Sequence, residues 1–202
     1  DNATLFVVGD TSLDEVKTVL EDEFGKWQAK GSKGIKQIAQ ASLPEQGRTV
    51  IIDRPGSQQS LILAAHLAPP TGIDNNIAIE TMNQTLGGAF TARVNMNLRE
   101  DKGWAYGAYT FLQDARGQRP FMVYAPVQTD KTGASLVELK KELNSYLGDK
   151  PPMPDELERA RLDQVRSLPG QYETSTAVLG SLLSSSRFNR PYNYPETLVE
   201  QY

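Results

Sequence analysis

The sequence predicts an α+β fold with a mixed, largely antiparallel sheet and helices packed on one face. Two observations predict this class. Short apolar runs rich in β-forming residues come in pairs separated by turn residues, as in hairpins. Longer segments with apolar residues three or four positions apart alternate with these pairs, as in amphipathic helices. The order β-β-α-α-β-β-α-α-α, which follows an N-terminal strand and helix, favours an antiparallel or mixed sheet.

A strand and a helix are expected first along the chain. Residues 3–8 are apolar and rich in β-formers, which predicts a buried strand. Ser12 and Glu15 have the spacing of a capping box, and the helix that they begin would end at Gly25. The apolar stripe of this helix consists of Leu13, Val16, Leu20 and Phe24.

A polar segment then divides the chain. Residues 28–47 contain three glycines and one proline and show no helical or strand periodicity. A loop of this length is unusual inside a compact domain. We therefore predict that residues 1–28 are the strand-helix end of a preceding domain, residues 29–47 a linker, and residues 48–202 a second domain.

The second domain is expected to begin with a hairpin and a helix. Residues 48–53 and 60–67 are strand candidates on either side of the turn Pro55-Gly56. Asp74 is the predicted N-cap of a helix that runs to about Leu86.

Another hairpin and three helices are expected toward the C-terminal end. Residues 105–112 and 120–127 are apolar strand candidates separated by a polar turn. Prolines separate the helical stripes that follow, which are Leu136, Leu139, Leu143 and Leu147; Leu157, Ala160, Gln164 and Leu168; and Val178, Leu179 and Leu182.

Composition excludes several classes of function. The net charge of -4 over 202 residues argues against a binder of phosphate backbones, so no nucleic-acid partner is expected. The longest nearly apolar run, residues 61–68, is too short to cross a bilayer, so no membrane span is expected. The absence of cysteine excludes disulfides, thiolate catalysis and cysteine-type zinc sites.

The chain contains one histidine, His66, which lies in an apolar strand candidate. Zinc hydrolysis needs two or three convergent His or carboxylate ligands and a carboxylate that activates water, so no metal site is expected in this chain. We interpret His66 as a structural or sheet-surface residue. A Ser-His-Asp triad through His66 stays open as an alternative, although no nucleophile-elbow pattern accompanies it.

Arg99 and Tyr106 are the candidate site residues. Arg99 falls in a helix predicted over residues 90–101. The buried stripe of that helix would be Phe90, Val94 and Leu98. At about 100° per residue, Arg99 would point about 180° away from Phe90. Tyr106 would begin the next strand, so its phenol and the guanidinium could converge on one surface, where they would suit peptide carbonyls or developing negative charge.

The same residues have simpler explanations, which the pattern alone leaves open. Arg99 could bridge to a nearby carboxylate, and Tyr106 could pack on the sheet. Trp104 is either an aromatic that contacts a substrate or a half-buried packing residue.

The segment from Leu86 to Gly107, LGGAFTARVNMNLREDKGWAYG, resembles the second-half signature of the pitrilysin or mitochondrial-processing-peptidase type of zinc peptidase. Its Leu-Gly-Gly turn, aromatic residue, Arg, Leu-Arg-Glu and later Gly and Tyr follow the order of the family. The resemblance covers nearly the whole chain. Residues 2–27 are similar to the end of the family's first half, and the tract after Arg54 is similar to the opening of its second half.

This resemblance implies one half of a clamshell in which two homologous halves close around a chamber. In this family the first half carries an inverted His-x-x-Glu-His zinc motif, and the second half contributes an Arg and a Tyr that hold the substrate backbone near the metal. By motif position that substrate-binding pair would be Arg99 and Tyr106, whereas no His-x-x-Glu-His occurs here. The chain would then be the C-terminal, non-catalytic half, which closes over an extended peptide against zinc carried by a catalytic half in the same polypeptide or a partner subunit.

The resemblance also leaves one alternative open, because the family includes scaffold subunits that have lost peptidase activity. Under the main interpretation the chain has no activity alone and forms part of a zinc metalloendopeptidase when complete. A start at Asp1 without a leader suggests a piece of a longer protein, and we expect its second half to be truncated at the C-terminal end. The resemblance favours an enzyme exported in a bacterium, for example to the periplasm.

Overall fold

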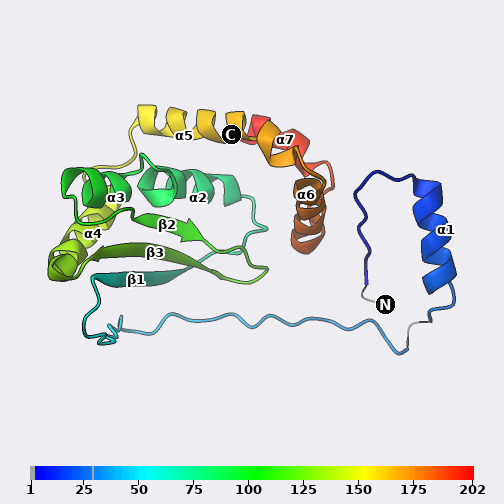
Figure 1. Cartoon of the computed structure of the whole chain (residues 1–202), viewed down its shortest axis with the longest axis horizontal. Coiled ribbons are helices and arrows are strands. Elements are labelled where there is room, and N and C mark those ends of the chain that lie inside the picture. Colours follow the sequence, from blue (N-terminus) through cyan, green and yellow to red (C-terminus); the bar gives the residue numbers. More distant parts are fainter. Residues whose placement is uncertain (1–2, 29) are drawn as a thin grey trace. The chain divides into compact units, whose positions relative to one another are not determined.

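A computed structural model describes residues 3–28 and 30–202 (Figure 1). In this part of the chain the sheet has three strands. The spatial order is β1 (Gln59–Ala68), β3 (Arg119–Gln128) and β2 (Tyr109–Leu112), and both pairings are antiparallel. The predicted hairpin at residues 105–112 and 120–127 is therefore confirmed, with β2 beginning at Tyr109.

Helices cover one face of this sheet. Two helices follow strands in the sequence. α2 (Asn76–Asn83) comes after β1, and α4 (Thr132–Leu147) comes after β3. Apolar side chains of the strands and helices form one core, which includes Ile62, Val123, Ala125 and Val127 from the strands and Leu86, Val94, Leu98, Leu139 and Tyr146 from the helical segments. The predicted α+β class is confirmed, and within the described residues the sheet is wholly antiparallel.

The predicted hairpin between residues 48–53 and 60–67 is wrong. β1 pairs along its whole length with β3, from Gln59 opposite Gln128 to Ala68 opposite Arg119. The turn at Gly56 does form, with a positive φ of 80°, but residues 48–53 are not a strand. Apolar composition alone cannot make a strand, because its backbone N–H and C=O groups need a paired neighbour.

The buried strand predicted at residues 3–8 is also absent from the described part of that segment, where Leu5 and Val7 are exposed. The helix after it is confirmed as α1 (Leu13–Phe24). Its capping box forms as predicted, because the Ser12 hydroxyl accepts from Glu15 N at 3.3 Å and Glu15 Oε2 accepts from Ser12 N at 2.9 Å.

The predicted helix between Asp74 and Leu86 is present in two parts. α2 is followed by a π-helical segment, η1 (Gln84–Gly88), in which Leu86 is buried. The N-cap is Asn75 rather than Asp74, since a turn closed by Asn76 N donating to Ile73 O at 3.1 Å precedes the helix.

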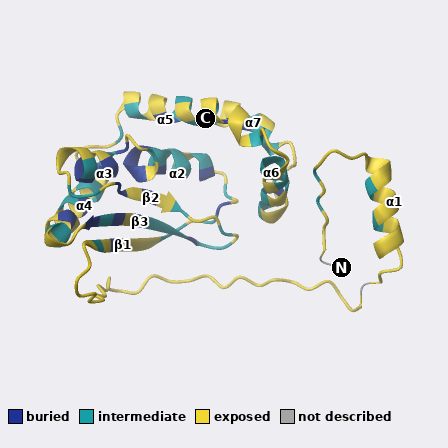
Figure 2. Ribbon diagram, in the orientation of Figure 1, coloured by how far each residue is buried: buried dark blue, intermediate teal, exposed yellow. Residues whose placement is uncertain are grey.

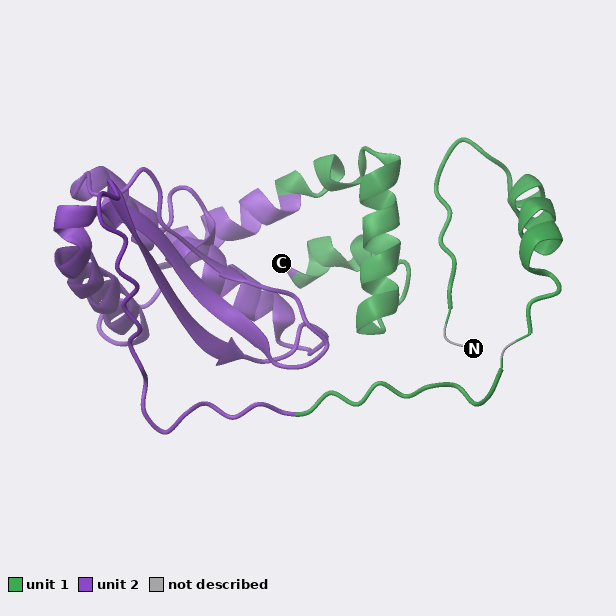
Figure 3. Ribbon diagram, turned by 60° about the horizontal axis from the view of Figure 1, so that its bottom comes forward, with its two compact units in different colours: residues 1–39, 166–201 green, residues 40–165, 202 purple. Residues whose placement is uncertain are grey.

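The chain divides into two compact units, which Figure 3 distinguishes by colour. One unit comprises residues 40–165 with residue 202 and holds the sheet and its helices. The other comprises residues 1–39 and 166–201. The helices toward the C-terminal end are α5 (Pro154–Ser167), α6 (Ser175–Phe188) and α7 (Tyr194–Gln201), and α7 was not predicted.

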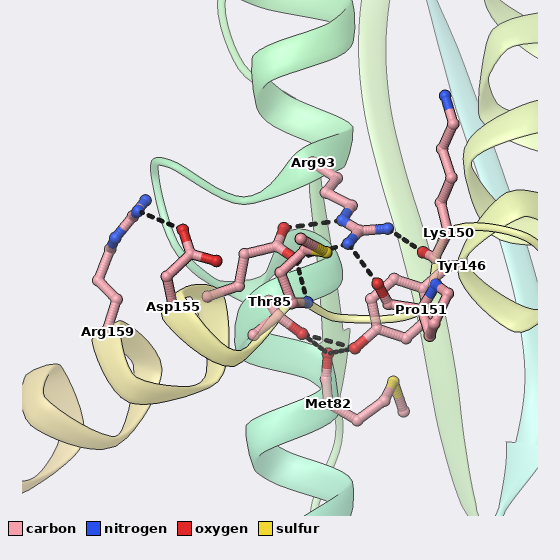
Figure 4. A network of polar contacts seen from close by, with 10 residues as sticks. Met82, Thr85, Arg93, Tyr146, Lys150, Pro151, Asp155 and Arg159 are labelled. Carbon is pink, nitrogen blue, oxygen red and sulfur yellow. Dashed lines mark hydrogen bonds and ion pairs between the residues drawn. The ribbon is translucent and has the colours of Figure 1, made fainter.

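A polar network fastens α5 within the larger unit (Figure 4). Arg93 donates from Nε to Glu156 Oε1 at 2.8 Å and from Nη2 to Oε2 at 2.5 Å. The same guanidinium donates to the carbonyls of Lys150 and Pro151, the latter at 2.9 Å, and lies 5.1 Å from the ring centroid of Tyr146. One arginine thereby joins the loop before α5, the first turn of α5 and the end of α4.

Candidate functional site

Arg99 lies on a helical segment that changes character halfway. α3 (Arg93–Asn95) continues as the π-helical η2 (Met96–Asp101), in which Lys102 N donates to Asn97 O five residues back at 3.0 Å. Asn97 Nδ2 donates to Glu138 at 2.9 Å and to Glu142 at 2.7 Å. These bonds hold η2 against α4, and the bond from Asn97 is the main reason that the pKa of Glu138 is lowered.

Phe90 does not belong to this helix, so the orientation predicted for Arg99 relative to Phe90 is wrong. The helix begins at Arg93, and Phe90 lies in the turn before it, where Ala92 N donates to Ala89 O at 3.1 Å. Val94 and Leu98 are buried as predicted, but Phe90 is 55% exposed. The double glycine Gly87-Gly88 did predict a turn before this helix, but the turn extends past Phe90 and the helix begins three residues later, at Arg93.

A tight turn at Gly103 reverses the chain after η2 and places Tyr106 close to the end of that segment. Gly103 has a φ of 65°, in the left-handed region that favours glycine. The backbone N–H groups of Trp104 and Ala105 then both donate to Leu98 O, at 2.9 and 3.3 Å. Trp104 packs half-buried against the core, while Tyr106 is 85% exposed.

The structure brings Arg99 and Tyr106 together and adds Phe90 to them. The guanidinium carbon of Arg99 lies 4.3 Å from the ring centroid of Phe90 and 5.6 Å from that of Tyr106, both within cation–π range. Its Nε lies 3.4 Å from Glu100 Oε1, so the simpler carboxylate bridge is present as well. The Arg99 side chain remains 29% exposed. The arrangement can hold a carbonyl or a carboxylate from solvent beside an exposed phenol.

The sheet face away from the core presents apolar side chains within the larger unit, and much of β1 is coloured as exposed in Figure 2. Leu63 and Tyr109 each lie opposite Tyr124 across the sheet, so the three side chains form a row. Exposed large apolar residues on these strands are Leu61, Leu63, Tyr109, Phe111 and Tyr124. Aromatic and aliphatic surface of this kind can contact apolar side chains of a bound chain.

The residues that the structure describes do not fit a zinc site. No group of three or more His, Cys, Asp or Glu side chains suited to a metal occurs in residues 3–28 and 30–202. His66 is exposed on β1, where its Nδ1 lies 2.8 Å from Leu67 O. Within the described residues its ring makes no hydrogen bond to a serine or a carboxylate, so the geometry does not form a triad through His66.

None of the helices in the described part of the chain has both the length and the apolarity needed to cross a bilayer.

Comparison with family models gives a match that covers most of the chain. The model described as the peptidase M16 inactive domain matches residues 1–162. An uncharacterised zinc protease of Mycobacterium leprae is 21% identical over 143 residues, which are 71% of this chain and 32% of that protein.

Solved structures include similar folds. The peptidase M16 inactive domain from Pseudomonas fluorescens has a TM-score of 0.66 at 27% identity, over 73% of this chain and 35% of that one. A protease from Helicobacter pylori has a TM-score of 0.82 at 17% identity, over 96% of this chain and 47% of that one, and this likeness concerns the fold alone. The chain thus spans between 32% and 47% of the length of these relatives.

Proposed function

The chain belongs to the peptidase M16 family through its inactive domain, and from this premise we propose that it positions an extended peptide for a zinc site carried by another half of the protein. In this proposal Arg99 and Tyr106 bind a peptide carbonyl next to the scissile bond. Residues 1–28 would close the preceding half, residues 29–47 would link the halves, and residues 48–202 would form the substrate-binding half.

One observation carries this proposal, namely the contact of a partly exposed Arg99 with the ring of an exposed Tyr106. Neither side chain is buried in the hydrophobic core, so both can contact a ligand. A guanidinium presents several N–H donors in a fixed plane, and a phenol adds one O–H, so together they suit a carbonyl oxygen that gains negative charge. The exposed apolar row on the sheet supports an extended peptide as the ligand.

No group of three or more described side chains of this chain could hold the metal. The proposal therefore includes a catalytic half that carries the zinc. The catalytic half would be covalently attached or a separate subunit. An exported, for example periplasmic, location also stays a proposal, supported by the bacterial origin of the relatives named above.

The test is peptide cleavage by the complete protein with both halves. We expect Arg99→Ala to lower kcat/KM about 100-fold, as for the loss of a charged donor to a developing oxyanion. Tyr106→Phe should lower it about tenfold, as for the loss of one neutral hydrogen bond. Zinc content should stay unchanged in both variants.

Matched controls exist on the surface of the chain. Arg161→Ala removes an arginine whose bidentate partner is Glu158, and Tyr192→Phe changes another exposed tyrosine. Both should leave kcat/KM unchanged. If Arg99→Ala and Tyr106→Phe behave like these controls, the substrate-positioning role is wrong and the scaffold alternative takes its place.

A further inference from the structure

Asn95 in α3 is fully buried, and both ends of its side-chain amide are engaged. Its Nδ2 donates to the backbone carbonyl of Phe90 at 2.6 Å, and its Oδ1 accepts from the backbone N–H of Ala108 at 3.0 Å. A carbonyl can only accept and a backbone N–H can only donate, so these partners fix the orientation of the amide.

The two backbone segments joined by this amide carry the two rings that contact Arg99. Phe90 is itself one of them, and Tyr106 precedes Ala108 by two residues. Both rings are exposed, so packing in the core does not fix them. Their positions depend on how the backbone beneath each ring is anchored, and Asn95 supplies one anchor to each segment.

We propose that Asn95 is a positioning residue, whose amide sets the distance between the Phe90 turn and the Tyr106 segment and so holds Arg99 between their rings. Asn95 touches no substrate and acts only through the backbone. A buried amide with both ends satisfied is suited to this task, since any displacement of either segment leaves a polar group unpaired. The consequence for peptide cleavage rests on the proposed function, whereas the geometric claim does not.

Two variants separate the two bonds. Asn95→Leu has a similar shape and removes both hydrogen bonds. Asn95→Asp keeps an oxygen that can accept from Ala108 N but removes the donation to Phe90 O. Asn83→Leu is the matched control, because Asn83 is also buried, its Oδ1 accepts from Thr110 Oγ1 at 2.8 Å, and its side chain makes no hydrogen bond to the described Phe90 or Tyr106 segments.

The first measurement is NMR of the 202-residue chain, following nuclear Overhauser contacts from the Arg99 side chain to each ring. We expect Asn95→Leu to lose the contacts to both Phe90 and Tyr106. Asn95→Asp should lose chiefly those to Phe90, and Asn83→Leu should keep both sets. Unchanged contacts in a folded Asn95→Leu protein would overturn the proposal, as would failure of both Asn95 variants to fold, which would make the amide a requirement of the whole fold.

The second measurement is peptide cleavage by the complete protein. A misplacement of about 1 Å can cost about 100-fold in rate, so kcat/KM should fall about 10- to 100-fold in Asn95→Leu and at most about twofold in Asn83→Leu. If Arg99→Ala has no effect in the otherwise unchanged protein, the proposed function fails, and the NMR contacts still decide the role of Asn95. If Arg99→Ala lowers cleavage but Asn95→Leu does not, the positioning role alone is wrong.

Discussion

At the scale of single residues, the surroundings of Arg99 set what the candidate site can do. Two aromatic rings and one neighbouring carboxylate, that of Glu100, contact its guanidinium. A cation–π contact restricts the plane of the guanidinium without using its N–H donors, whereas an ion pair uses at least one of them. The rings of Phe90 and Tyr106 therefore orient Arg99 and leave most of its donors available to a ligand.

Replacing Phe90 tests this orienting effect. We expect Phe90→Leu to remove a cation–π contact worth about 0.5–1 kcal/mol, which corresponds to a fall of about two- to fivefold in kcat/KM of the complete protein. Phe24→Leu, at a similarly exposed phenylalanine of α1, is the control. An equal effect of both substitutions would show that the ring of Phe90 has no particular role.

At the scale of elements, close approaches decide how helical segments lie on the sheet. η1 meets β2 at Gly87, where an added Cβ would lie 2.6 Å from Thr110 Oγ1 and 2.7 Å from Thr110 N. The second of these atoms belongs to the backbone of a strand and cannot move aside alone. The absence of a side chain at Gly87 is therefore what allows this contact.

Gly87→Ala should accordingly destabilise the chain by about 1–3 kcal/mol, the usual effect of overpacking. Urea unfolding followed by circular dichroism measures it. Gly133→Ala, in α4, is the matched control, since an added Cβ there meets nothing within 4 Å, and it should be neutral or stabilising by up to about 1 kcal/mol. A Gly87→Ala protein as stable as wild type would contradict this account of the η1–β2 contact.

The Arg93–Glu156 pair makes the attachment of α5 depend on pH. The hydrogen bonds from Arg93 are the main reason that the pKa of Glu156 is lowered from its ordinary value of 4.5. A carboxyl whose folded pKa is lowered stabilises the fold above its unfolded pKa, and that stabilisation is lost as the pH falls through the folded pKa. Both side chains are mostly buried, so solvent screens the pair only in part.

The corresponding variant is Glu156→Gln, which should lower the free energy of unfolding by about 2 kcal/mol at neutral pH. The difference from wild type should begin to shrink near pH 4.5 and vanish as the pH falls through the lowered pKa of folded Glu156, because the wild-type side chain is then protonated and as uncharged as glutamine. Urea unfolding at several pH values measures this difference. A constant difference at all pH values would mean that the charge of Glu156 does not matter.

At the scale of the whole molecule, the chemistry of peptide cleavage is expected to depend on residues outside this chain. Because no described group of side chains could hold zinc, the isolated chain should show no peptidase activity with added zinc. Calorimetric titration with zinc should likewise show no tight binding. Chelator-sensitive turnover by the isolated chain would overturn the assignment of this half as non-catalytic.

The sequence by itself determined features that depend on neighbours along the chain. The capping box at Ser12 and Glu15, the buried positions of Val94 and Leu98, and the hairpin that contains β2 and β3 all follow from local spacing and turn residues. The candidate pair Arg99 and Tyr106 also came from the sequence, through a resemblance to a zinc-peptidase family, and its role stays a proposal.

Only the tertiary structure decided features that depend on partners distant in the chain. Residues 48–53 have the composition of a strand, but β1 pairs with β3 instead, so Val50, Ile51 and Ile52 stay at least 70% exposed. Phe90 has helical spacing from Val94, yet the turn before α3 moves its ring onto Arg99. The spacing of residues in the sequence predicts only the relative directions of side chains within one helix or strand. Strand pairing and ring contacts also depend on which distant segment of the chain packs beside that element.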